Sequence, residues 1–175
     1  MSATTKQVYR VMIEAPVEKV WEVLTQSGRP LPFFFGSVLH TTSLGPGAPI
    51  RMRTPDGKNT GVVGEVLEFD PPRRYAHTFK FTSENDPLCR VTYELEPVDG
   101  GTRFTLTSEE VPVGTKTEKY MGQGTEFICN TLKSLVETGQ PNLKQKFFLF
   151  MMKCTSFMTP RQSRSENWPL DKAIT

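Results

Sequence analysis

The pattern of hydrophobic and polar positions predicts a strand, a helix and an aromatic segment at the start of the chain. Apolar and polar residues alternate from Val8 to Glu14, which is typical of a half-buried strand. Apolar residues then recur at helical spacing over residues 17–24, with Pro16 placed at the helix start. Residues 28–36 contain three consecutive phenylalanines between prolines and glycines, which predicts a short helix or a lid-like loop.

A series of short strands follows, because turn signals rich in Gly, Pro, Asp and Asn interrupt the alternating segments at regular intervals. Turns short enough for hairpins favour an antiparallel meander over a parallel sheet. The six predicted strands lie near residues 37–44, 49–54, 61–69, 73–82, 88–96 and 101–109.

The pattern changes to a helical period near residue 119. Apolar side chains then share one broad face as far as Thr138, and Gly139 stands at the expected helix end. A sheet must bury one face, and this helix is the only predicted element large enough to cover it. The sequence therefore predicts an α+β fold in which a seven-stranded curved antiparallel sheet wraps round a long C-terminal helix, within a domain of residues 1–140.

Residues 141–175 form a predicted C-terminal extension with an amphipathic helix rich in Phe and Met. Apolar residues occupy most of the circumference of this helix over residues 143–158, so something should cover it. Two alternatives stay open: the helix packs back on its own domain, or it binds a protein partner, a second copy in a homodimer, or a membrane surface. The extension carries six basic and two acidic residues.

Composition narrows the function classes. The 175 residues are 37% hydrophobic and carry a net charge of +2, which fits one folded domain and argues against nucleic acid as the main partner. Cys89, Cys129 and Cys154 are widely spaced and form no metal-binding pattern. No segment resembles a signal peptide or is long enough for a membrane span, so a reduced, cytoplasmic chain is expected.

Several blocks of residues resemble a known family. They run from Ile13 to Leu24, from Gly64 to Arg74, from Gly100 to Thr107, and from Gly124 through Leu132 to Gly139. In this order they resemble the SRPBCC or START-like superfamily, in the branch similar to the C-terminal domain of the ninety-kilodalton heat-shock protein ATPase activator. The resemblance implies a helix-grip fold that encloses an apolar cavity. It also implies several possible functions, because members include lipid carriers, cyclases and co-chaperone domains.

A ligand-binding cavity between the sheet and the long helix is the favoured site. In the strand of residues 73–82, alternation places His77 on the same face as three aromatic residues. His77 could orient a ligand or act as a general base, or it could be a hydrogen-bonded core histidine. The predicted ligand-binding residues are Trp21, Phe33, Phe34, Phe35, Met52, Tyr75, His77, Phe79, Tyr93, Phe104, Gly124, Phe127 and Ile128.

The favoured function is binding of a small hydrophobic molecule, with no catalytic residues, metal or cofactor assigned. Two alternatives remain: a cyclase- or aromatase-like enzyme that uses the same cavity, and a co-chaperone-like protein-interaction domain. Arg51 and Arg53 share one side of a predicted strand, where they could clamp an anionic group if that side faces the cavity. Otherwise they are expected to face solvent.

Overall fold

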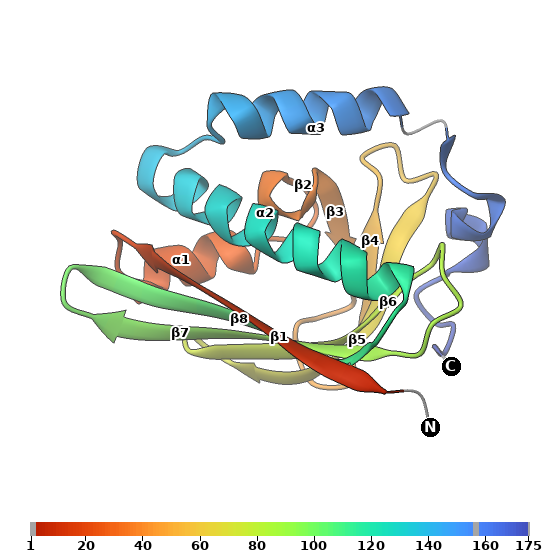
Figure 1. Ribbon diagram of the computed structural model, residues 1–175, viewed down its shortest axis with the longest axis horizontal. Coiled ribbons are helices and arrows are strands. Elements are labelled where there is room, and N and C mark those ends of the chain that lie inside the picture. Colours follow the sequence, from red (N-terminus) through yellow and green to blue (C-terminus); the bar gives the residue numbers. More distant parts are fainter. Residues whose placement is uncertain (1–2, 156–157, 175) are drawn as a thin grey trace.

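One curved antiparallel sheet of eight strands makes up most of the fold in the computed structural model, which describes residues 3–155 and 158–174. Its order is β1-β8-β7-β6-β5-β4-β3-β2, so consecutive strands are neighbours from β2 to β8 and β1 pairs with β8 at the other edge (Figure 1). The strands are β1 Thr4–Ile13, β2 Pro30–Leu31, β3 Ser37–His40, β4 Pro49–Arg53, β5 Thr60–Asp70, β6 Arg74–Phe81, β7 Cys89–Val98 and β8 Gly101–Pro112.

The predicted meander is confirmed, but the predicted number of seven strands is one too few. The additional strand is β2, whose two residues pair with Val38 and Ser37 of β3 at the sheet edge. It lies in the segment for which a short helix or a loop was expected. The segment holds both an edge strand and a 3-10 helix at Pro32–Phe34, because Pro30 needs no ladder partner at an edge.

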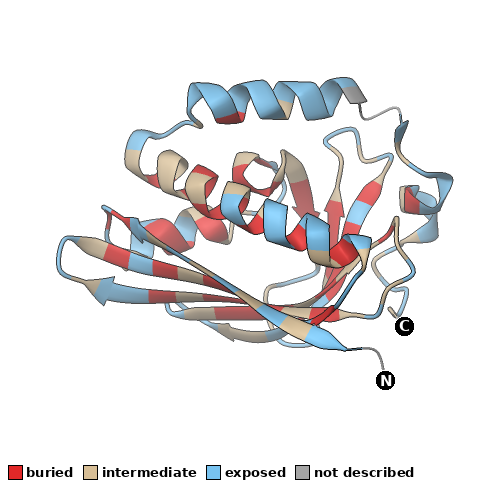
Figure 2. Cartoon of the chain, viewed as in Figure 1, coloured by how far each residue is buried: buried red, intermediate tan, exposed pale blue. Residues whose placement is uncertain are grey.

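The long helix α2, Lys116–Thr138, lies across the inner face of the sheet (Figure 1). The side chain of Thr115 caps its start by accepting a hydrogen bond from the Glu118 amide, and Gly139 ends it with φ 79°. Its buried side chains, among them Ile128, Cys129 and Leu132, face the sheet (Figure 2). The shorter helix α1, Val17–Leu24, buries Val20, Trp21 and Leu24 in the same core.

Irregular pairing between β5 and β6 bends the sheet round α2. The register shifts between Val66 and Glu68, as a β-bulge does when it increases the local twist. Close by, the backbone of Gly64 comes so near to β6 that a Cβ atom there would overlap the carbonyl oxygen of Thr78. A glycine is therefore required at this position.

The extension beyond α2 has two parts, which differ in how far the rest of the protein covers them. Helix α3, Leu143–Thr155, begins with a reciprocal cap in which Asn142 and Gln145 each bind the backbone amide of the other. It lies beside α2 on the side away from the sheet, and its surface is almost entirely exposed (Figures 1 and 2). No helix among the described residues is long and apolar enough to cross a membrane.

The chain after α3 returns to the sheet. Two 3-10 helices, Arg161–Ser163 and Ser165–Asn167, lie beside β4, β5 and the end of β6. The hydroxyl of Thr82 donates to Ser163 over 2.8 Å, and Asn59 forms a β-bridge with Arg164. The terminal segment is therefore attached to its own domain, whereas the outer face of α3 is not covered.

Candidate functional site

A small apolar cavity of about 60 Å³ lies between the inner face of the sheet and α2. Strands β5 to β8 form its floor, α2 forms its roof, and the phenylalanine segment borders one side. The lining residues are Phe34, Phe35, Val62, Phe79, Phe81, Val91, Tyr93, Leu106, Ser108, Tyr120, Met121, Gly124, Thr125 and Ile128.

Ser108 supplies an unpaired polar atom in this apolar lining. Its side chain is fully buried on β8, and its hydroxyl has no hydrogen-bond partner within the described part of the chain. The hydroxyl of Thr125, by contrast, donates to the Met121 carbonyl over 2.7 Å. A buried hydroxyl without a partner costs roughly 1–3 kcal/mol, so Ser108 is the position where a bound molecule would gain a hydrogen bond.

Phe35 closes one side of the cavity against α2. Its ring stacks on Phe127 with 4.9 Å between centroids and 14° between planes. The edge of the Phe35 ring also lies over Gly124, where a Cβ atom would be in van der Waals contact with it at 3.4 Å. The backbone of Phe35 has φ 57°, a left-handed conformation that costs a non-glycine residue about 1–2 kcal/mol.

The three phenylalanines have different positions. The expected short helix is present as the 3-10 helix Pro32–Phe34, and a lid-like role of the segment stays a prediction. Phe33 is only 2% exposed and belongs to the core. Phe34 is also buried but lines the cavity, and Phe35 is half-buried at its border.

His77 lies on the aromatic face of β6, as alternation predicts, between Tyr75 and Phe79. Its Nδ1 donates to the Thr78 carbonyl over 2.8 Å, because that oxygen can only accept. Its Nε2 then accepts from the Tyr93 hydroxyl over 3.4 Å. Burial lowers the pKa of His77 to about 4, so the imidazole is neutral at pH 7. It does not line the cavity and has the geometry of a core histidine.

Two tyrosines and two cysteines on the inner face of the sheet and on α2 are also held in their neutral forms. Burial raises the pKa of both Tyr75 and Tyr93, which keeps the two phenols protonated. It also raises the pKa of Cys89 to about 11 and of Cys129 to about 12, so neither thiol supplies a thiolate nucleophile at neutral pH. Among the described residues, no cluster of three or more metal-ligating side chains occurs.

The structure brings six of the residues predicted for the site to the cavity wall: Phe34, Phe35, Phe79, Tyr93, Gly124 and Ile128. The remaining seven lie outside the wall. Phe127 stacks behind Phe35, Trp21 packs on Phe69, and Tyr75 and His77 continue the aromatic row. Phe33, Met52 and Phe104 are buried in the core.

Sequence reasoning missed several wall residues, including Ser108, Tyr120 and Thr125. Alternation gives a signal for Ser108, because it places this residue on the same face of β8 as Phe104 and Leu106. The sequence does not reveal whether the Ser108 hydroxyl is paired.

Arg51 and Arg53 were expected either to face the cavity, where they could bind an anionic group, or to face solvent. Neither expectation is correct, because both side chains bind another part of the protein. They project from the side of β4 opposite the core and bind the backbone of the terminal segment. Arg51 is fully buried, and its guanidinium donates to the carbonyls of Pro169 and Lys172, the latter over 2.6 Å. Arg53 donates to the carbonyl of Trp168. Their ligand is therefore the protein's own C-terminal backbone.

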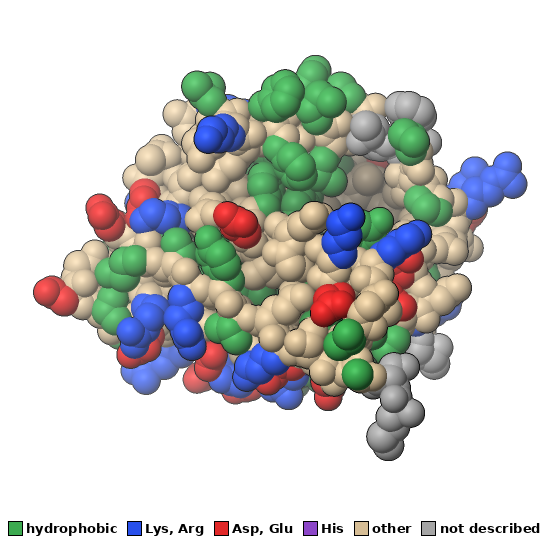
Figure 3. Space-filling model, viewed as in Figure 1, with side chains coloured by type: hydrophobic (Ala, Val, Ile, Leu, Met, Phe, Trp, Pro, Cys, Tyr) green, Lys and Arg blue, Asp and Glu red, His purple; other side chains and the backbone are tan. Residues whose placement is uncertain are grey.

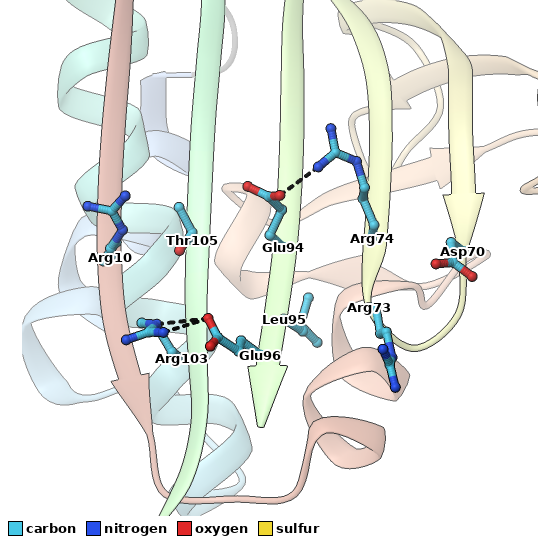
Figure 4. A pocket seen from close by; sticks show the side chains of 9 residues that line it. All are labelled: Arg10, Asp70, Arg73, Arg74, Glu94, Leu95, Glu96, Arg103 and Thr105. Atoms are coloured by element: carbon cyan, nitrogen blue, oxygen red, sulfur yellow. Dashed lines mark hydrogen bonds and ion pairs between the residues drawn. The ribbon is translucent and has the colours of Figure 1, made fainter. Parts of the chain in front are cut away.

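A larger hollow of about 670 Å³ lies on the outer face of the sheet (Figure 4). Four of its charged side chains form two ion pairs: Arg74 binds Glu94, and Arg103 binds Glu96 over 2.6 Å. Arg10, Asp70 and Arg73 also line the hollow, so the lining carries both signs of charge. Exposed pairs of this kind are typical of the solvent face of a sheet, so the small inner cavity is the better candidate site.

The fold and the buried inner cavity define a helix-grip protein, in which a curved antiparallel sheet encloses a long helix. The sequence profile of the family described as Activator of Hsp90 ATPase homolog 1-like protein matches residues 14–137. The chain belongs to this family. No curated protein matches the chain.

Solved structures share the fold. The Aha1 dimer from Colwellia psychrerythraea aligns with a TM-score of 0.61 and 18% identity, over 77% of this chain and 98% of that one. CalU16 from Micromonospora echinospora aligns with a TM-score of 0.58 and 19% identity, over 90% and 95% of the two chains. DynU16, from the dynemicin biosynthetic locus, aligns with a TM-score of 0.60 and 26% identity, over 78% of this chain and 48% of its own.

Proposed function

We propose that this chain binds a compact, mainly apolar molecule that carries one hydrogen-bonding group, in the cavity between β5–β8 and α2. The observation that carries the proposal is the unpaired, fully buried hydroxyl of Ser108 in the wall of an apolar cavity. Ligand pockets combine such an apolar lining with a few polar groups that fix orientation. A ligand group that bonded Ser108 would remove the desolvation cost of a hydroxyl that has no partner in the described part of the chain.

The volume of the cavity restricts the size of the ligand. At about 60 Å³, the space is well below the roughly 300–1,000 Å³ of pockets for drug-sized molecules. A molecule larger than a few heavy atoms must therefore displace a side chain. Phe35 is the group suited to move, since it borders the cavity, is half-buried and leaves a strained backbone conformation when it is released.

Binding is favoured over the cyclase- or aromatase-like alternative because the cavity lacks a proton-transfer pair. His77 has both nitrogens engaged and a pKa of about 4, and it lies behind the wall. Tyr93, which does line the cavity, is held as a neutral phenol by burial. General acid–base catalysis needs a titratable group with a pKa near the working pH and in reach of the substrate.

The test compares phenol with toluene, a hydrocarbon of similar shape, by ligand-observed NMR on the full chain. Both molecules are larger than the cavity of about 60 Å³, so their binding requires Phe35 to move. We expect both to bind, with phenol preferred, and we expect Ser108→Ala to reduce the ratio of phenol to toluene affinity at least about fivefold. The factor follows from the roughly 1–3 kcal/mol that an unpaired buried hydroxyl costs. Toluene binding should change little, because it does not use the hydroxyl.

A pair of matched substitutions tests whether the compounds bind in the cavity. Val91→Phe adds a ring to the cavity wall and should abolish the binding of both compounds, whereas Val113→Phe makes the same change at an exposed position. Absence of binding to the unmodified chain, or equal binding by the Val91→Phe variant, would refute the proposal. Thermal unfolding of both variants confirms that they fold.

A further inference from the structure

Helix α3 presents an apolar surface that no part of the described chain covers. Most of the large apolar side chains that are exposed in the described residues lie in residues 143–158. Leu143 is 84% exposed, Phe147 66% and Phe150 61%. Figure 3 shows the hydrophobic side chains gathered along this helix at the top of the molecule. Surface concentrations of this kind mark contact with another apolar phase or partner.

The helical positions arrange four of the apolar side chains of α3 in one stripe that faces away from the domain. At 3.6 residues per turn, Leu143, Phe147, Phe150 and Cys154 fall within an arc of about 60°. The opposite side carries Gln145, which is buried, and Phe148, whose ring lies 4.9 Å from that of Phe127. The contact of Phe148 with α2 therefore holds α3 in an orientation in which the stripe points away from the domain.

Lysines border the stripe on both sides. Lys144 lies at one edge and Lys146 and Lys153 lie at the other, and α3 contains no acidic residue. A helix with an apolar face and flanking lysines has the pattern of elements that lie in a membrane interface, where the apolar face enters the acyl boundary and the ammonium groups meet anionic headgroups. At about 20 Å long, α3 is too short to cross a bilayer and would lie along its surface.

We propose that α3 docks the protein onto a phospholipid bilayer that carries anionic headgroups. The charge pattern favours this occupant over a second copy of the chain. Two α3 stripes packed face to face would bring Lys144 and Lys146 of one copy toward the same lysines of the other, and like charges at an interface are costly. A convex helix surface also fits a planar bilayer without a groove in the partner.

The test measures flotation of the full chain with vesicles of phosphatidylcholine alone and with vesicles in which one quarter is phosphatidylglycerol. Flotation is expected with the anionic vesicles, with a loss at high salt. Lys144→Glu combined with Lys146→Glu should lower partitioning roughly 30-fold or more, because each lysine near an anionic surface strengthens binding about fivefold. Phe147→Ser combined with Phe150→Ser should lower it at least about tenfold.

Leu67→Ser combined with Val113→Ser is the matched control, since it removes two exposed apolar side chains from other parts of the surface. This control should float like the unmodified chain, and thermal unfolding of all variants should agree. No flotation with anionic vesicles would overturn the proposal, as would flotation that the Phe147 and Phe150 substitutions leave unchanged. A dimer that dissociates on these substitutions, without any vesicle binding, would show that a second copy covers α3 instead.

Discussion

Burial sets the protonation state of His77, because the charged imidazolium would lose its hydration in a fully buried site. The hydrogen bond to the Thr78 carbonyl acts in the opposite direction, but burial is the larger effect and lowers the pKa to about 4. A histidine whose folded pKa lies below its unfolded value opposes folding once the unfolded chain binds a proton.

We therefore predict that His77 destabilises the fold in mild acid. The unfolded chain takes up the proton near pH 6.5, whereas the folded chain resists until about pH 4. Stability is thus complete above pH 6.5 and falls as the pH drops toward 4, by about 2 kcal/mol between pH 7 and pH 5. Urea unfolding at both pH values measures the change, and His77→Gln should reduce it by that amount. An equal loss in the variant would show that other groups cause it.

At the scale of single residues, the side of the sheet on which a residue lies could be predicted but its hydrogen-bond partners could not. Alternation in residues 74–81 correctly placed Tyr75, His77 and Phe79 on the inner face. The partners of His77 depend on the register of β6 with β7, which brings His77 opposite Val91 and close to Tyr93. Register is a property of paired strands, so one strand's sequence does not contain it.

At the scale of elements, Arg51 links β4 to the terminal segment. The guanidinium lies in a site with no exposed surface, and its donors are satisfied by the backbone carbonyls of Ile50, Pro169 and Lys172. Bonds from a charged donor are roughly twice as strong as neutral ones. A buried arginine hydrogen-bonded to these carbonyls is thus a strong local anchor for a segment that contributes no residue to the hydrophobic core cluster.

Replacement of this anchor should release the terminal segment while the sheet stays folded. Arg51→Met keeps the length of the side chain but removes all of its donors, so we expect trypsin to cleave after Arg161 and Arg164 at least about tenfold faster. Arg10→Met is the control, because Arg10 is exposed on β1. Mass spectrometry of a digestion time course measures the cleavage. Equal cleavage of the Arg51 variant and the unmodified chain would show that other contacts hold the segment.

Periodicity predicted the elements well wherever one face is buried. The change from a period of two to a helical period located α2 to within three residues at its start and correctly at its end. It failed at β2, because a strand of two residues has no period. It also did not reveal that the terminal segment would cover Arg51 and Arg53, since the contact joins residues more than a hundred positions apart through backbone carbonyls.

At the scale of the whole molecule, the inner cavity and α3 lie on different parts of the structure but meet at Phe35. Its ring borders the cavity and also lies 6.3 Å from the ring of Phe148 on α3. Residues 4–138 contain the sheet, α2 and all cavity-lining residues. The extension contributes the outward apolar stripe and the terminal anchor.

Truncation after Gln140 should therefore separate the two proposed activities. The sheet and α2 keep their core contacts, and the polar groups of Arg51, Thr60 and Thr82 that the terminal segment covers become accessible to water. We expect a folded chain that is less stable by about 1–3 kcal/mol. It should still prefer phenol to toluene but should no longer float with anionic vesicles.

Near-ultraviolet circular dichroism and urea unfolding measure the fold of the truncated chain, and the NMR and flotation assays measure the two activities. Loss of phenol binding by a folded truncated chain would mean that the extension is part of the cavity's closure, with Phe148 holding Phe35 in place. Retained flotation would place membrane contact on the domain of residues 1–140 and contradict the assignment to α3. An unfolded product would show that the sheet needs the terminal segment in order to fold. Arg51 would explain this requirement, because its guanidinium would lose the carbonyls that bind it.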